Sequence, residues 1–218
     1  MLTLGFDTAT ARVTVAVAEG LQVLAEVATT DARRHGEVLA PSIDAVLEEA
    51  GVVPSALTAV AVGVGPGPFT GLRVGLVTAR TLGLALGIPV VGVCTLDLIA
   101  AEAAVSLVRD GRFLVATDAR RKEVYWATYD VAPELERLDG PHVSSPSVLD
   151  WRGPAVGSGA LLYPDAFPDA QAPAHPQAAT LCRWVSQGRA TVEPLPLYLR
   201  RPDAAEPRLR KRVSGPVT

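Results

Sequence analysis

The sequence has few residues that could bind a metal or form disulfides, and no segment suited to cross a membrane. Only two of its 218 residues are cysteine and three are histidine. Cys94 and Cys182 lie far apart in apolar or helical contexts, which excludes a disulfide framework and a C-x-x-C metal or redox site. No apolar run reaches the roughly 18 residues of a membrane span without turn residues, and the N-terminus begins like a strand, with no basic leader. We therefore expect a cytoplasmic protein in a reducing compartment.

Excess charge of one sign is also lacking. The formal net charge is −3, and non-specific nucleic-acid affinity comes mainly from phosphate neutralisation by lysine and arginine. A broad attraction to a phosphate backbone is therefore not expected. The exception is the end of the chain, 201–218, where Arg200 is followed by basic residues: Arg201, Arg208, Arg210, Lys211 and Arg212. This stretch has two interpretations, a solvated and disordered tail or a basic arm that touches RNA.

The first half of the chain has the pattern of a ribonuclease-H-like lobe. With 49% hydrophobic residues, the chain can form one large domain or two small ones. Valine-rich and leucine-rich segments separated by tight turns predict an antiparallel meander of three strands at 2–6, 13–19 and 21–27. Helical spacing and glycine stops then predict helix, strand, helix, strand, helix at 35–50, 59–64, 72–86, 89–93 and 96–108, with Thr95 capping the last helix.

A similar but shorter pattern starts again after the charged break at 109–112. Strands are predicted at 113–117, 122–129, 134–139 and 154–157, and a helix at 177–188. Proline and glycine are dense between 140 and 176, which predicts long connections rather than a packed core. Two such lobes in tandem make the two-lobed actin-like α/β architecture, in which mixed sheets are flanked by helices. We expect a first lobe at 1–108, a second at 109–200 and a tail at 201–218.

The most specific motif follows a buried strand. Residues Gly63–Gly75 read GVGPGPFTGLRVG, which resembles the G-x-GPGSFTG-[LV]-R-[IV]-G signature of the TsaB family, with Pro68 where serine is usual. Glycines permit close backbone approach and prolines stiffen the loop. Pro68 removes a backbone donor, and the loop lacks a Gly-Lys-Ser/Thr ending. The sequence therefore favours a structural strand-to-helix turn over a vestigial phosphate site, which would comprise Asp7, Thr8, Gly65, Gly67, Thr70 and Gly71.

Further matches in the same order extend this resemblance over nearly the whole chain. The segment Phe6–Thr10 is similar to the opening I-D-T-A/S-T of the family, and His35–Ile43 to its H-S-E-x-L-x-P-x-I helix start. Asp118–Trp126 resembles D-A-R-x-G-E-V-Y-W, Gly157–Gly159 a later glycine turn, and Pro196–Arg200 the closing P-x-Y-L-R.

The resemblance implies a supporting subunit without chemistry of its own. In the TsaB family the protein pairs with the larger homologue TsaD, and with TsaE, in the complex that transfers a threonylcarbamoyl group to the adenosine 3′ of the tRNA anticodon. The transfer site, ATP and metal belong to TsaD, so no intrinsic cofactor is expected here. A homodimer of the isolated chain stays open, and the resemblance implies that tRNA is contacted indirectly through the complex.

Two apolar helices are the candidate partner surface. The segment 72–86 has only Arg73 and Arg80 as charged residues, and a helix that is apolar all round is buried all round. One side can pack on the lobe's own sheet, while the other needs TsaD or a second copy of the chain. The residues that we expect at this surface are Leu39, Ile43, Leu72, Arg73 and Leu76. The alternative is that both helices are buried wholly within the monomer.

Two enzymatic alternatives remain. Asp7 ends the first strand, where actin-like ATPases place an acidic residue near phosphate and metal, although with Thr8 and Thr10 it could equally cap a tight turn. A metallopeptidase would need H-x-x-x-H on a helix, but the fifth position of a motif that starts at His35 is Leu39, and Glu37 points to another face. Ser158 lacks the G-x-S-x-G frame of a nucleophile elbow. No catalytic or metal-binding residue is therefore predicted.

Overall fold

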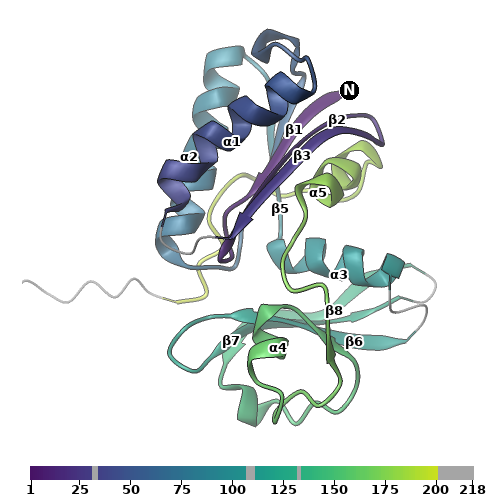
Figure 1. Ribbon diagram of the computed structural model, residues 1–218. Helices are drawn as coiled ribbons and strands as arrows, with labels where there is room; N and C mark the ends of the chain where they lie inside the picture. The colour runs from purple at the N-terminus through teal and green to yellow at the C-terminus, as the bar shows by residue number, and fades with distance from the viewer. Residues whose placement is uncertain (31–33, 107–110, 132–133, 201–218) are drawn as a thin grey trace, which may run out of the picture.

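The first half of the chain forms a five-stranded mixed sheet (Figure 1). In the computed structural model, which describes residues 1–30, 34–106, 111–131 and 134–200, the strand order is β3-β2-β1-β4-β5. The strands are β1 (Leu2–Asp7), β2 (Arg12–Glu19), β3 (Gln22–Thr30), β4 (Ala59–Gly63) and β5 (Val90–Val93). The first three pair antiparallel, as the predicted meander requires, and β4 and β5 join in parallel. Two helices, α1 (His35–Glu49) and α2 (Phe69–Leu86), and a short turn η1 (Pro54–Ala56) connect them.

The second sheet repeats this topology. Its strands are β6 (Arg112–Asp118), β7 (Val124–Asp130), β8 (Glu136–Ser144), β9 (Ala155–Val156) and β10 (Ala170–Gln171), in the order β10-β9-β6-β7-β8. Read from β8, three antiparallel strands are again followed by two parallel ones. The connections are shorter than in the first lobe, η2 (Pro146–Val148) and α4 (Ser158–Leu162). The tandem ribonuclease-H-like lobes of an actin-like fold are thereby confirmed.

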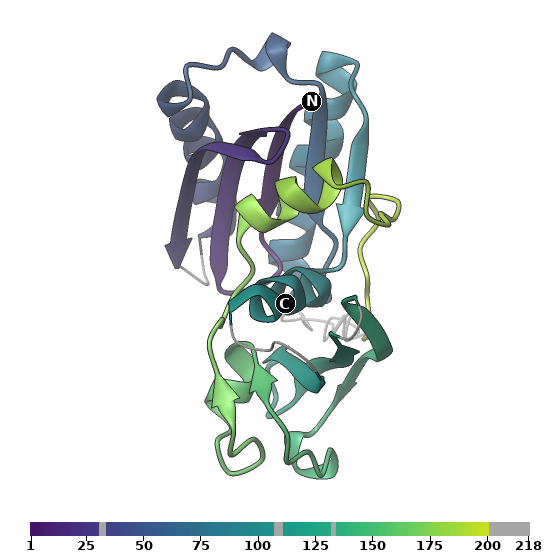
Figure 2. The same ribbon diagram turned by 90° about the vertical axis from the view of Figure 1, so that its right-hand side faces the viewer.

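The last helix of each lobe lies between the two sheets. Helix α3 (Thr95–Ser106) packs on the second sheet, where Leu96 and Ile99 share a core cluster with Phe113 and Val115. Helix α5 (Ala178–Ser186) returns to the first lobe and crosses the face of its sheet opposite α1 and α2 (Figure 2). The boundary predicted after residue 108 separates the strands of the two sheets, whereas the helices cross it. The lobes are therefore held together by exchanged helices.

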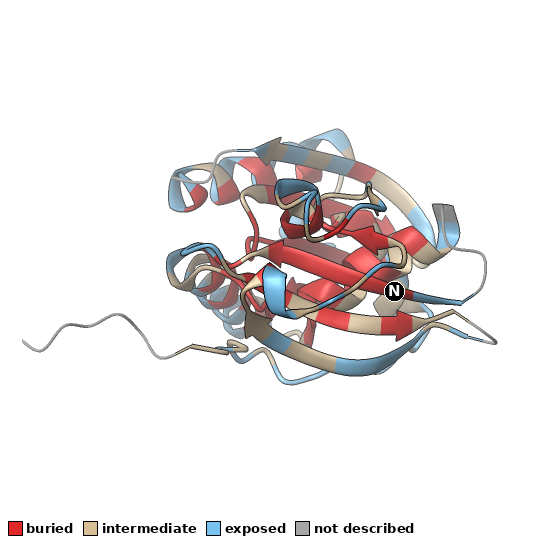
Figure 3. Ribbon diagram, turned by 90° about the horizontal axis from the view of Figure 1, so that it is seen from below, coloured by how far each residue is buried: buried red, intermediate tan, exposed pale blue. Residues whose placement is uncertain are grey.

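The centre of the molecule is buried (Figure 3), and β1 is buried along nearly its whole length. Side-chain alternation along β1 explains how its sheet is covered on both faces. Leu4 and Phe6 point toward α1 and α2 and are fully buried in the main core. The residue between them, Gly5, faces α5, where an added Cβ would lie 2.6 Å from Cys182 Sγ. Small residues on this face let α5 approach closely, since successive residues of a strand point to opposite faces.

Pro41 lies well inside α1, on its exposed side, where water can bond the carbonyl that loses its partner. Two local expectations were wrong. Thr95 is the first residue of α3, and its hydroxyl bonds Asp7 and Gly65 instead of capping the helix. The stretch 140–176 contributes a packed core around Phe167, which is fully buried. The tail at 201–218 lies outside the described residues.

No helix in the described part of the chain combines the length and apolar character needed to cross a membrane.

Candidate functional site

Asp7 joins three segments at the end of β1. Its carboxylate is fully buried; Oδ1 accepts a 2.7 Å hydrogen bond from the Ala9 amide, and Oδ2 accepts one of 2.7 Å from the Thr95 hydroxyl. The Thr95 oxygen in turn accepts from the Gly65 amide at 3.1 Å. Asp7 therefore fastens the β1–β2 turn to the glycine loop and to the start of α3.

Burial raises the pKa of Asp7 above its ordinary value, because it removes water from the charged form. The hydrogen bonds from Thr95 and Ala9, and the nearby His35, act in the opposite direction. A buried carboxyl group held in this way links neighbouring segments of the fold. It does not present oxygens to a solvent-borne ligand.

The glycine motif holds the same turn. Four glycines spaced four residues apart, Gly63, Gly67, Gly71 and Gly75, each face the β1–β2 turn, and a Cβ on any of them would overlap Asp7, Ala9 or Thr8. The Thr8 hydroxyl also donates to the Gly71 carbonyl at 2.8 Å. The motif is thus a groove filled by the protein's own turn, because glycine is the residue that lets another backbone come this close.

Most residues of the candidate phosphate site are likewise buried within the protein. Asp7, Thr8, Gly65, Gly67 and Gly71 are all buried, and only Thr70, in the first turn of α2, is exposed. The amide of Gly65 is already bonded to Thr95, and Pro68 has none to offer. Neither of these two positions therefore offers a backbone donor to a phosphate.

His35 is a buried structural residue. Its Nε2 donates to the Thr10 carbonyl at 2.7 Å, which fixes the start of α1 to the β1–β2 turn. In the ranges that the structure describes, no group of three or more His, Cys, Asp or Glu side chains could hold a metal ion.

A cavity of about 280 Å³ lies between the lobes, beside the turn. It is lined by Ala9–Ala11 and Pro68 from the first lobe and by second-lobe residues, Thr117, Asp118, Arg120, Ser158, Leu162 and His175. Asp7 does not line it. The Asp118 carboxylate here is paired with Arg120 at 3.3 Å, so the charges that face the cavity already balance one another.

Four of the five expected partner residues lie inside the first lobe. Leu39, Ile43, Leu72 and Leu76 expose 1%, 6%, 1% and 4% of their surface and belong to the core between the sheet and the helices. Their assignment to a partner surface is therefore corrected. The helical spacing that singled them out marks the face of each helix that packs on its own sheet. Only Arg73 is exposed.

The outward face of α2 is a stripe of different residues. Val77 and Leu84 expose 63% and 86% of their surface. They lie at helical spacing with the exposed cations Arg73 and Arg80. Helix α1 lies beside α2 and exposes Glu37, Asp44, Glu48 and Glu49 along with Ala40 and Ala45. This pair of helices forms a mixed apolar and charged face, which we call the α1–α2 face.

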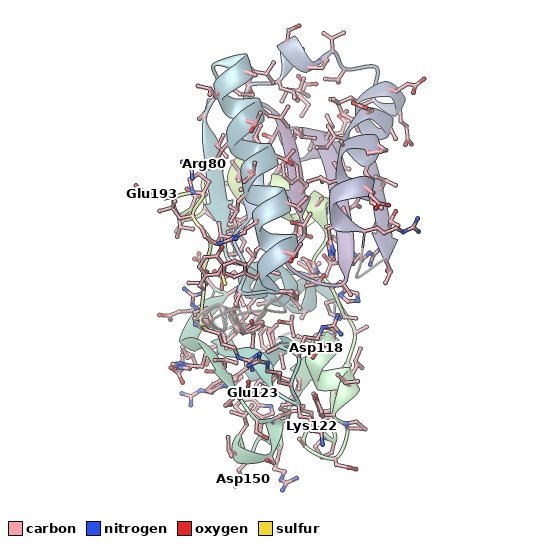
Figure 4. The ribbon with its side chains drawn as sticks, turned by 90° about the vertical axis from the view of Figure 1, so that its left-hand side faces the viewer. Arg80, Asp118, Lys122, Glu123, Asp150 and Glu193 are labelled. Atoms are coloured by element: carbon pink, nitrogen blue, oxygen red, sulfur yellow. The ribbon has the colours of Figure 1, made fainter. Side chains whose placement is uncertain are left out.

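The C-terminal segment 189–200 forms a strap that the sequence did not reveal. Val192 forms an antiparallel bridge with Gly92 of β5. The ring of Tyr198 stacks on that of Phe69, with 4.6 Å between the ring centroids. The Arg73 guanidinium lies over the Phe69 ring, with its Cζ 3.6 Å from the ring centroid. Its Nε donates a hydrogen bond of 3.0 Å to the Tyr198 hydroxyl. Glu193 of the strap lies next to Arg80 of α2 (Figure 4). The only sequence signal was the closing Pro196–Arg200 match.

The strap ends on the second lobe. Arg200 donates to the Ala119 carbonyl at 2.8 Å and pairs with Glu123. Leu197 packs against the core clusters of both lobes. The strap therefore bridges the N-terminus of α2 and the β6–β7 turn.

Comparison with known proteins identifies the family to which this chain belongs. A family model described as TsaD, tRNA N6-adenosine threonylcarbamoyltransferase, matches residues 22–155. The chain is also 37% identical over 142 residues, 61% of each chain, to the tRNA threonylcarbamoyladenosine biosynthesis protein TsaB of Escherichia coli. The chain belongs to the TsaB/YeaZ-like proteins of this family. An uncharacterized protein of Mycobacterium tuberculosis is 44% identical to this TsaB-like chain over 205 residues, 92% of each.

Solved structures agree with the family. A protein from Pseudomonas aeruginosa, described as similar to the peptidase YeaZ, is 30% identical to this TsaB-like chain. It superimposes with a TM-score of 0.77 over 91% of this chain and 99% of its own. YeaZ from Pseudomonas aeruginosa gives a TM-score of 0.76 at 28% identity, over 90% and 100%. The whole two-lobed fold is therefore shared.

Proposed function

We propose that this chain is the supporting subunit of the complex that forms threonylcarbamoyladenosine in tRNA, and that it binds and activates the catalytic homologue TsaD. The family match and the named TsaB relatives support the pathway. The main support for a non-catalytic role is that Asp7 and the segment Gly63–Gly75 hold the protein's own β1–β2 turn. A residue locked in this way contributes to the fold rather than to phosphate chemistry.

The α1–α2 face is the proposed partner surface. Val77 and Leu84 supply exposed apolar area on this face, its exposed acidic residues belong to α1, and its exposed cations, Arg73 and Arg80, belong to α2. Such a face suits a homologue that carries the same pair of helices, because opposite charges can then pair across the interface. A stable contact would bury on the order of 1,200–2,000 Å² in total. Two copies of this chain could pair in the same way when TsaD is absent.

ATP and metal are assigned to TsaD in this proposal, and TsaE is the further partner. The chain would work in the cytoplasm, where tRNA is modified. An independent ATP-binding enzyme is not favoured, because Asp7 is fully buried and bonded to Thr95 and Ala9.

The test is association followed by activity. The chain is mixed with TsaD from the same organism and examined by size-exclusion chromatography with light scattering. Threonylcarbamoyl transfer to tRNA is then measured with and without the chain. A new heterodimer and a transfer rate that depends on the chain are expected. Absence of association together with ATP turnover by the isolated chain would move the assignment to an actin-like ATPase.

A further inference from the structure

The β6–β7 turn carries three consecutive cations in left-handed backbone conformation. Arg120, Arg121 and Lys122 have φ values of 60°, 54° and 60°, and all three are exposed. Side chains larger than glycine rarely adopt this region, and asparagine or glycine would reverse the chain with less strain. Strain of this kind concentrates at functional sites. Like charges on neighbouring residues add a second cost, so chain reversal alone does not explain the composition of the turn.

The neighbouring contacts hold this turn in place. The Arg120 amide donates to Asp118 Oδ1 at 2.8 Å, and its guanidinium pairs with Asp118 at 3.3 Å. Arg200 of the strap bonds the Ala119 carbonyl and pairs with Glu123. Asp118 and Glu123 are thus each paired with a cation. Arg121 and Lys122 carry two further formal positive charges on a loop that is fixed at both ends.

Lys122 lies at the rim of a cavity of about 460 Å³ on the second lobe. The same cavity is lined by Arg152 and Tyr163, and by the carboxylates Asp150 and Asp165. Arg152 and Asp150 approach to 3.5 Å with both side chains largely in solvent, where such pairs contribute little. Among the ion pairs of the described residues, Lys122 has no carboxylate partner.

The turn lies on the same side of the molecule as the proposed partner surface. Figure 4 looks onto α1 and α2 and shows Asp118, Lys122 and Glu123 on the second lobe beside them. The chain beyond Arg200, which is anchored on this turn, continues with Arg201 and four further basic residues. A polyanion held by a partner on the α1–α2 face would therefore pass this turn.

We propose that the β6–β7 turn is a direct contact for the phosphate backbone of the RNA substrate, with Arg121 and Lys122 as the contacting cations. This inference rests on the proposed function, which brings tRNA to the complex. Cations on a fixed loop neutralise phosphates and release counterions. Two cations cannot supply a high affinity alone, and the turn therefore adds to a larger surface on TsaD.

The experiment uses the full chain with TsaD and an unmodified tRNA transcript. Fluorescence anisotropy gives the Kd over a series of KCl concentrations. The Arg121→Gln/Lys122→Gln variant should raise Kd several-fold, and the slope of log Kd against log salt should fall by about 1 for each phosphate that is no longer neutralised. Lys122→Gly should weaken binding while its Tm does not fall, because glycine accepts this φ without strain. Arg112→Gln, at the opposite end of β6, is the matched charge control and should leave both quantities unchanged.

The outcomes separate this inference from the proposed function. If transfer depends on the chain but the double variant binds tRNA with unchanged Kd and slope, the turn is not an RNA contact and the proposed function stands. If the double variant instead loses association with TsaD, the turn is a protein surface and the inference is overturned. If transfer does not depend on the chain at all, the proposed function itself fails.

Discussion

Thr95 donates a buried hydrogen bond of 2.7 Å to Asp7 across 88 positions of the sequence. Asp7 ends the first strand of the first lobe, and Thr95 begins the helix that packs on the second sheet. The same hydroxyl oxygen accepts from the Gly65 amide. In this protein the acidic residue that an actin-like ATPase would offer to phosphate and metal therefore serves as a structural link between the lobes.

Replacing Asp7 by asparagine should change how stability depends on pH. The folded-state pKa of Asp7 lies above its ordinary value of 3.8 because of burial. Its contribution to stability is therefore full below about pH 3.8 and is lost as pH rises through the folded-state pKa. The wild type should lose unfolding free energy relative to Asp7→Asn over that window. Urea denaturation of both proteins at several pH values measures the difference, and parallel curves would contradict the account.

Adding one methyl group at Gly67 should destabilise the protein. A Cβ there would overlap the Ala9 carbonyl, and overpacking of this kind costs about 1–3 kcal/mol. Gly36 is the matched control, since its Cβ would meet only Val74 at 3.8 Å. Gly36→Ala lies within α1 and should stabilise by about 0.5–1 kcal/mol. Denaturant unfolding compares the two, and equal effects would show that the motif is not a packing groove.

Much of the fold could be predicted from the sequence because local patterns specify it. The meander and the helices on the outer face follow from alternation and helical spacing, and they formed close to the predicted bounds. The return of α5 to the first sheet could not be predicted, because it depends on small residues such as Gly5 meeting Cys182 far along the chain. Periodicity also does not distinguish a face that packs on its own sheet from one that meets a partner. For this reason Leu72 and Leu76 were assigned to the wrong surface.

Two adjacent residues of α2 should separate folding from association. Leu76 exposes 4% of its surface and Val77 63%. Leu76→Glu buries a charge in the core and should cost about 3 kcal/mol or more. Val77→Glu should change stability by no more than about 0.5 kcal/mol, yet prevent binding to TsaD. Thermal unfolding and light scattering of each variant check this, and a Val77→Glu variant that still binds TsaD normally would count against the α1–α2 face.

The strap should depend on the ring of Tyr198. Tyr198→Ala removes the stack on Phe69 and the partner of Arg73, and an aromatic pair contributes about 0.5–1.5 kcal/mol beyond its buried area. Limited proteolysis should then cleave the segment 189–200 faster than in the wild type. Tyr198→Phe keeps the stack and loses only the hydrogen bond, so it should resemble the wild type more closely. Equal cleavage of all three proteins would mean that the strap is held by other contacts.

The chain is proposed to act through TsaD by way of its exposed helices. The most direct measurement is the rate of threonylcarbamoyl transfer to tRNA by TsaD with TsaE, compared without this chain, with the wild-type chain, and with the Val77→Glu/Leu84→Glu variant. We expect strong stimulation by the wild type and, with the folded variant, a rate near that of TsaD and TsaE alone. Stimulation by the variant equal to that of the wild type, or transfer that is just as fast without any chain, would show that the chain does not act through these helices.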